Sequence, residues 1–387
     1  MHEQPRAKWV LAAGAAVQLL TGIPAAWGVF QKPVMEDYGF SRGQATLGFA
    51  ILVAAYGLGC LLGGYLQDAR GPRAAGLLGT ALLGGGFVAA AFVPQGNAVL
   101  FLLIFSLPAG LGSAFLAPSV LACVQKWYTD KKGFATGVTG IATGLSGAFL
   151  TLFVRLVGGH FGMRVCFGAL GGVMLAVCGA GAAVLKNPPT QGEAQPEKGD
   201  DLSPKEMLRT RQYRLCVAAV ALAAAPAALV RPAILSLAAE RGLAENLAQW
   251  CVVIGSAASA AGRLACPALS DRLGRKPVLY GVYGGLAAGT LAFAFAGGWF
   301  VAAAYAALTF FYSGGAAVQP ALNTDLFGLK HAGVNYGFIA LGMSAGSLLS
   351  YAGSQLLPMG ARHWAAGACA LAGLVCITLV KPVNKSR

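Results

Sequence analysis

Long apolar runs recur along the whole of this sequence. Twelve of them are each about 20 residues long or more, which is the length a helix needs to cross a bilayer. In round limits they are 8–31, 44–67, 74–93, 98–125, 133–156, 164–186, 213–236, 246–269, 277–297, 299–322, 333–356 and 362–381. Because lipid offers no partners to the backbone, such segments span it as helices. We therefore predict an all-α membrane protein with twelve transmembrane helices.

Composition and charge agree with this fold class. The chain is 57% hydrophobic and only 11% charged, whereas soluble domains carry about 25% charged residues. The net charge of +14 comes from basic residues that flank the apolar runs, a pattern that reflects membrane topology. We therefore expect the lipid bilayer as a partner and no nucleic acid.

The longest polar stretch divides the chain into two halves of six spans. We predict an N-terminal half at 1–186, a linker at 187–212 and a C-terminal half at 213–387. The loop holding Asp68 resembles the loop holding Asp271, and DKKGFATG at 130–137 resembles LKHAGVNYG at 329–337. Two parallel repeats of this kind indicate a transporter architecture with its substrate site between the halves.

The distribution of positive charge predicts the orientation. Most of the 28 lysines and arginines lie in the loops on the side that also holds both termini. Cytoplasmic loops of membrane proteins are enriched in these residues. We expect a multi-pass protein of the cell (inner) membrane with both termini in the cytoplasm.

Arg263 is a lone arginine inside the apolar run that ends near Ser270. Eight residues separate it from Asp271, which places it roughly 12 Å inside the membrane boundary, close to the midplane of a hydrocarbon core about 30 Å thick. An arginine there costs at least about 2.5–3.5 kcal/mol. Small neighbours, among them Ser259 and Gly262, leave room for a ligand. Arg263 is therefore the leading candidate for an anion-binding residue; the alternative is a structural arginine bonded to helix carbonyls.

Weaker candidates lie in neighbouring spans. Tyr56 and Tyr312 could line a cavity with their hydroxyls, although aromatic residues at helical spacing often serve packing alone. Thr139 and Thr143 share one helix face, but threonine also bonds to its own helix backbone. Arg231 is either a second substrate cation or an anchor at the membrane interface, and Arg155 is open to the same two interpretations.

Charged residues in the two related loops are candidates for gating. They are Asp68, Arg70 and Arg73 in the first loop, and Asp271, Arg272 and Arg275 in the second. A carboxylate at a helix end can pair with arginines and with the positive start of a neighbouring helix. Such contacts could hold one side of a carrier closed; the alternative is simple loop capping and membrane anchoring.

These loops resemble the signature of the major facilitator superfamily. Within it, the chain is similar to oxalate/formate antiporters and monocarboxylate carriers over nearly its whole length. The matching stretches are Trp27 with Lys32-Pro33-Val34, Leu66 to Arg73, Lys126 to Gly133, Gly262-Arg263, Asn323 to Gly328 and Asn335 to Phe338. The resemblance implies alternating-access carriage of small carboxylates, with the carboxylate contacted by Arg263. A guanidinium suits this role because it can bind a carboxylate with two parallel hydrogen bonds.

The chain also departs from that family. The oxalate carrier it resembles has a lysine in the eleventh span, and the matching position here is Met343. Its aromatic cage corresponds to Ala25, Ala117, Thr143, Ser313 and Ala317. One buried cation suits one carboxylate, so we predict a monocarboxylate as the substrate rather than oxalate.

Proton coupling is not indicated, because none of the fourteen acidic residues falls inside a predicted span. This favours anion exchange or facilitated diffusion, although a proton could travel with the substrate. Two alternatives remain: a carrier of the same fold for a drug or another metabolite, and a sensor that does not transport. We expect no enzymatic activity, cofactor or metal site, and a monomer.

Overall fold

All regular secondary structure in the described chain is helical. The computed structural model describes residues 5–128, 132–188, 201–328 and 331–381. Residues 129–131 of the fifth-span motif, residues 189–200 of the predicted linker and the last residues of the chain lie outside these ranges. The helices are α1 (Pro5–Thr21), α2 (Ile23–Tyr38), α3 (Arg42–Arg70), α4 (Pro72–Ala90), α5 (Ala98–Phe101), α6 (Leu107–Trp127), α7 (Lys132–Phe153), α8 (Gly159–Val184), α9 (Pro204–Arg209), α10 (Arg211–Val230), α11 (Ile234–Glu240), α12 (Glu245–Leu273), α13 (Arg275–Phe295), α14 (Phe300–Phe327), α15 (Ala332–Leu356) and α16 (Met359–Leu379).

These helices form twelve membrane spans in the described residues. Eleven continuous stretches are long and apolar enough to cross a bilayer, and one of them, 134–184, has 51 residues. At 1.5 Å per residue this stretch would be more than twice the thickness of a bilayer core. Its backbone leaves the helical conformation at Gly162, where φ is +80°, so α7 and α8 are two spans. The predicted fold class is confirmed.

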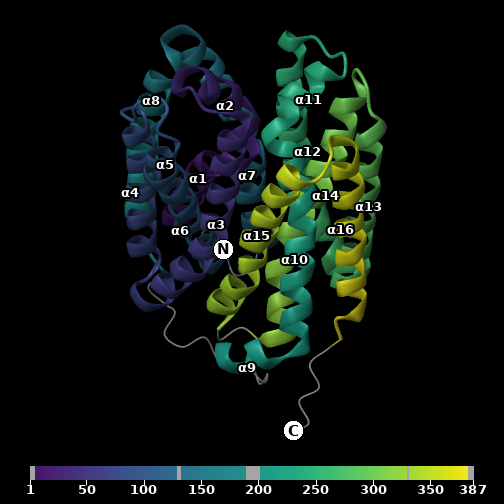
Figure 1. Cartoon of the computed structure of the whole chain (residues 1–387). Helices are drawn as coiled ribbons and strands as arrows, with labels where there is room; N and C mark the ends of the chain where they lie inside the picture. Colours follow the sequence, from purple (N-terminus) through teal and green to yellow (C-terminus); the bar gives the residue numbers. More distant parts are fainter. Residues whose placement is uncertain (1–4, 129–131, 189–200, 329–330, 382–387) are drawn as a thin grey trace.

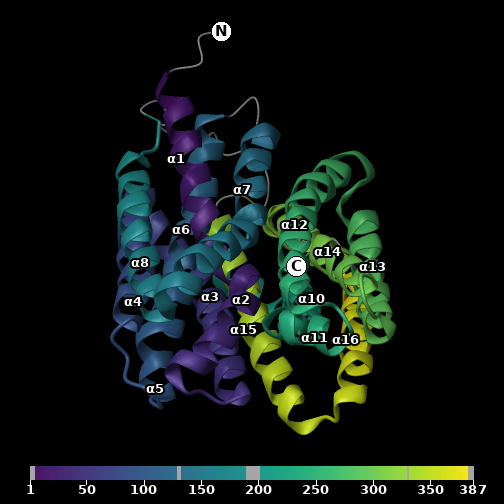
Figure 2. The same ribbon diagram turned by 90° about the horizontal axis from the view of Figure 1, so that it is seen from above.

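The spans form two groups that lie side by side. Figure 1 shows the purple-to-teal helices α1–α8 on the left and the green-to-yellow helices α10–α16 on the right, with α9 at the bottom. We call the end of the molecule near α9 the linker end and the opposite end the far end. The view in Figure 2 shows α3 beside α15 and α7 beside α12, where the two groups meet.

Small residues let these four helices approach closely. A β-carbon at Gly57 would overlap Ser344, and one at Gly144 would overlap the backbone of Ala260. The Ser344 hydroxyl donates a hydrogen bond to the Ala54 carbonyl of α3 over 2.6 Å. Close backbone contact and hydroxyl bonds are the usual means of joining helices in lipid.

The first helix of each half is broken within the span. Gly22 separates α1 from α2, and its N–H donates a hydrogen bond to the Ser146 hydroxyl of α7 over 3.1 Å. In the other half a 3₁₀ turn, Arg231–Ala233, separates α10 from α11. The first span of each half is therefore broken, with the second break further along its span than the first. The predicted spans 8–31 and 213–236 did not anticipate either of them.

The repeated loops end their helices in the same way. Gly71 ends α3 with φ +85°, and Gly274 ends α12 with φ +91°. Only glycine adopts such angles without strain. In each half the next helix, α4 or α13, begins at the following residue.

The outer surface of the bundle suits a bilayer. Large apolar side chains are exposed on it, and aromatic ones gather near its two ends. At the far end they are Phe161, Trp250, Phe295, Trp299, Phe300 and Trp364, and at the linker end Trp9, Tyr65 and Phe134. Aromatic belts at both interfaces are typical of membrane proteins.

Candidate functional site

A cavity of about 130 Å³ lies between the two halves at their centre. One half contributes residues of the α1–α2 break, α3, α6 and α7; the other contributes residues of α10, the 3₁₀ turn, α12, α14 and α15. Alanines, among them Ala117, Ala227 and Ala316, form much of the wall. A single buried water needs about 10–15 Å³, so the cavity has room for a small molecule.

Arg263 of α12 lines this cavity. It lies deep in the protein, yet part of its surface is accessible because its side chain borders the open space. Its Nε has no hydrogen-bond partner within the described chain. Three tyrosines, Tyr56, Tyr312 and Tyr336, are near enough to interact with its charge. A buried guanidinium with unused donors is a ready anion-binding group.

Of the other predicted binding residues, four line the same cavity: Tyr56, Thr143, Tyr312 and Met343. The Thr143 hydroxyl lies within 3.1 Å of the Gln18 amide oxygen and 2.9 Å of the Thr139 carbonyl. Thr139 is not among the lining residues. It is 1% exposed, and its hydroxyl bonds to the Ala135 carbonyl over 3.0 Å.

Some of the positions that correspond to the aromatic cage of the oxalate carrier also line the cavity, and others do not. Ala25, Ala117 and Thr143 line the cavity. Ser313 is buried next to it, and its hydroxyl bonds that of Ser259 over 2.7 Å. Ser259, which does line the cavity, is the residue one turn before Arg263. The described lining residues include no aspartate or glutamate.

Two lining residues had only weak signals in the sequence. Arg231 lies in the 3₁₀ turn, is 8% exposed, and places its guanidinium 4.6 Å from the centre of the Tyr312 ring. Tyr336 of α15 was noted only as part of a motif. An arginine followed by proline in an apolar run was the available clue to a broken helix, because proline removes a backbone donor.

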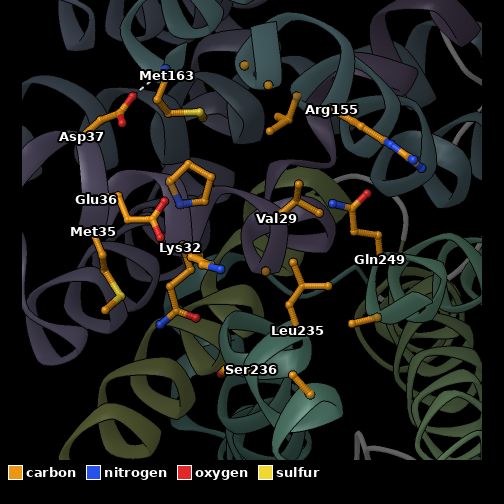
Figure 3. Close-up of a pocket in the computed structure, with 18 of the residues that line it drawn as sticks. Val29, Lys32, Met35, Glu36, Asp37, Arg155, Met163, Leu235, Ser236 and Gln249 are labelled. Atoms are coloured by element: carbon orange, nitrogen blue, oxygen red, sulfur yellow. Dashed lines mark hydrogen bonds between the residues drawn. The ribbon is translucent and has the colours of Figure 1, made fainter. Parts of the chain in front are cut away.

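A second cavity, of about 740 Å³, lies between the halves at the far end. Figure 3 shows Lys32 and Glu36 of α2, Arg155, Gln249 of α12, and Leu235 and Ser236 of α11 around it. We call it the far-end vestibule. Both signs of charge line it, so its larger volume does not make it the better anion site.

Between the central cavity and this vestibule, α2 packs against the 3₁₀ turn and the start of α11. A β-carbon at Gly28 of α2 would overlap Ile234 and the Arg231 carbonyl. An exposed ion pair, Arg42 with Glu240 at 3.5 Å, also joins the two halves at the far end. Within the described chain, the central cavity is therefore narrowed on this side by α2 and α11.

The predicted gating residues take different roles at the linker end. Asp68 of α3 lies next to Gly333, in the first turn of α15. It thus faces the positive start of a helix in the opposite half. In contrast, Asp271 pairs with Arg275, which also contacts Asp325 at 3.2 Å. These three residues join α12, α13 and α14 within one half.

Arg70, Arg73 and Arg272 are exposed, and none of them forms an ion pair within the described residues. Other motif residues serve structure. Trp27 is fully buried and stacks on Phe105 with ring centres 5.9 Å apart. Asn323 and Asn335 donate hydrogen bonds, each of 3.1 Å, to the carbonyls of Ala332 and Leu202.

Twelve spans in two repeated halves, with a cationic cavity between them, define a membrane transporter architecture. Comparison with known proteins agrees with this class. The model of the Major Facilitator Superfamily matches residues 10–230 and 216–386, and the chain belongs to this family.

Individual relatives are distant. An uncharacterized 38 kDa protein of Thermoproteus tenax is 30% identical over 90% of this chain and 87% of its own length. The oxalate:formate antiporter of Oxalobacter formigenes is 26% identical over 83% of this chain and 77% of its own. Among solved structures, the transporter FucP in its outward conformation aligns with a TM-score of 0.66 and 16% identity, covering 96% of this chain and 99% of FucP. The last comparison supports the fold alone.

Proposed function

We propose that this protein is a secondary carrier that moves small organic anions across the cell membrane by alternating access. The carboxylate of the substrate binds Arg263 in the central cavity. The single observation that supports this most is the unpaired Arg263 Nε beside open space between the halves. The guanidinium lacks a counter-charge among the described lining residues, and a carboxylate would supply one.

Monocarboxylates are the first substrates to test. Met343 lines the cavity at the position where the similar oxalate carrier has its lysine, so the cation pair of that carrier is absent here. The name of the antiporter relative includes formate, a monocarboxylate. A cationic drug is the weaker alternative, because no acidic residue lines the described cavity.

The proposed orientation of the carrier in the membrane rests on the charge pattern. Basic loops at the linker end support a cytoplasmic location for this end and for both termini. The lack of a carboxylate at the cavity supports exchange or facilitated diffusion over proton symport. The contacts of Asp68 with α15 and of α2 with α11 are candidates for the gates at the two ends.

Uptake of labelled acids into proteoliposomes tests this proposal. The panel contains formate, acetate, lactate, pyruvate and oxalate, with and without internal acid and at several external pH values. We expect at least one carboxylate to enter and Arg263→Gln to abolish its uptake. Arg155→Gln, which removes an arginine of the far-end vestibule instead, is the matched control.

The outcome is interpreted only for variants that elute as folded protein. If Arg263→Gln transports normally, Arg263 is structural. If wild-type protein moves no carboxylate at all, the substrate class is wrong, and a sensor of the same fold becomes the better hypothesis.

A further inference from the structure

The central cavity contains a second buried cation. Arg231 comes from the turn that breaks the seventh span, and it lines the same cavity as Arg263. It is 8% exposed, and its Nε has no hydrogen-bond partner in the described residues. An interfacial anchor would instead reach the headgroups at the far end. Arg231 is buried towards the centre, so the anchor interpretation does not account for it.

Tyr312 connects the two arginines. Its ring lies under the Arg231 guanidinium, and its phenol is near enough to interact with the charge of Arg263. The two guanidiniums also act on each other as like charges. A cation–π contact is worth only about 0.5–2 kcal/mol, so Tyr312 offsets a small part of the cost of holding two cations away from water.

The charge balance of the cavity determines which ligand suits it. Two guanidiniums face it, and the described lining residues include no aspartate or glutamate to neutralise them. A monocarboxylate would leave one cation uncompensated in a site of low dielectric, which is costly. An acid with two anionic groups would neutralise both and use the free donors of both.

We propose that Arg231 is the second anion-binding residue of the central cavity, and that the site prefers acids with two anionic groups over monocarboxylates of the same size. This inference rests on the proposed function of Arg263 and changes the class of substrate expected from the sequence. The second cation sits on the broken seventh span, while the eleventh-span position is the apolar Met343. Short dicarboxylates and carboxylate–sulfonates share the required chemistry.

Competition between matched acids tests the preference. Transport of one labelled acid is inhibited with propionate against malonate, butyrate against succinate, and butyrate against 3-sulfopropionate, at a pH where all acids are ionised. We expect the doubly charged member of each pair to inhibit at about tenfold or more lower concentration, as a charged hydrogen bond implies. Arg231→Gln should remove this ratio in the uptake that the variant retains.

A charge-preserving variant and a control complete the design. Arg231→Lys should restore part of the ratio, which a purely structural role would not do. Arg155→Gln should leave the ratio unchanged, because Arg155 lines the far-end vestibule. Size-exclusion profiles and melting temperatures establish that each variant is folded; if Arg231→Gln is not, the Arg231→Lys ratio decides.

Two failures can be told apart. If monocarboxylates move in an Arg263-dependent way but matched diacids compete no better, or if Arg231→Gln keeps the wild-type ratio, the inference on Arg231 is wrong and the proposed function stands. If no acid moves, or if Arg263→Gln transports as well as wild type, both are wrong.

Discussion

At the level of single residues, the proposed binding of a carboxylate depends on Arg263. Arg263 reaches the middle of a membrane protein without a partner for its Nε in the described chain, and an arginine at that depth is costly. We propose that ligand binding is the reason for its presence there. Its planar guanidinium offers donors in a fork that matches a carboxylate, whereas a lysine offers a point charge.

The forked geometry of the Arg263 guanidinium can be tested with Arg263→Lys. The charge remains, but the paired hydrogen bonds to the carboxylate are lost. We expect KM for the transported acid to rise about tenfold, by analogy with the loss of a charged hydrogen bond, while Arg263→Gln is inactive. Initial uptake rates over a range of acid concentrations measure this; wild-type kinetics for Arg263→Lys would show that geometry is unimportant.

Trp27 carries a prediction about stability. It is fully buried among aromatic rings, including Phe30, Phe49 and Phe105. Trp27→Ala should destabilise the fold by about 3–5 kcal/mol, seen as a lower melting temperature in detergent. Trp9→Ala is the matched control, because Trp9 is 71% exposed and its loss should change the melting temperature little.

The sequence revealed some of these residues better than others. Arg263 stood out because a charge deep in an apolar run is rare. Arg231 was ambiguous because an arginine near a span's end can either snorkel or face inward. The packing of α14, which places Tyr312 against the Arg231 guanidinium, shows that this side chain faces inward. For Thr139 and Thr143, one helical turn separates a buried residue from one that lines the cavity.

At the scale of helices, the breaks in the first span of each half matter most. The second parts of these two broken helices, α2 and α11, contact each other on the far-end side of the central cavity. Hydropathy predicted all twelve spans, because apolar length is a property of the sequence alone. It did not predict the breaks, since a helix and a broken helix can have the same hydropathy.

The two related loops make different contacts in the structure. Asp68 contacts a helix of the other half, whereas Asp271 is paired within its own half. We therefore expect Asp68→Asn to reduce transport several-fold by weakening closure of the linker end. Asp271→Asn should cost no more than about 1 kcal/mol of stability, because Asp271 is 63% exposed.

Uptake rates and melting temperatures of the two variants, measured side by side, test this difference. Equal effects on transport would mean that the two loops act alike. A large loss of stability in Asp68→Asn, with transport per folded molecule unchanged, would assign Asp68 to helix capping alone.

For the whole molecule, the repeat and the charge pattern predict its place in the membrane. A reporter protein that works only in the cytoplasm, fused after Arg387, should be active, and one that works only outside should be inactive. The distribution of lysine and arginine is the physical reason. The reverse result would place the linker end outside and exchange the two proposed gates.

The overall fold was predictable because twelve apolar spans and a repeat leave few arrangements open. The cavity was harder to predict from the sequence than the fold. Its walls come from both halves and depend on which small residues meet across the interface, as Gly144 meets Ala260. The sequence shows that these residues are small, but their partners come only from the packed structure.

The central claim is that one cavity binds an anion and opens to each side of the membrane in turn. Ala228 lines that cavity, so Ala228→Cys, made after replacing the nine native cysteines, can report on it. A membrane-impermeant thiol reagent is added to either side of oriented membranes. We predict labelling from both sides, protection by the transported acid, and no protection in Arg263→Gln. Labelling from one side alone, or labelling that no acid slows, would contradict the account.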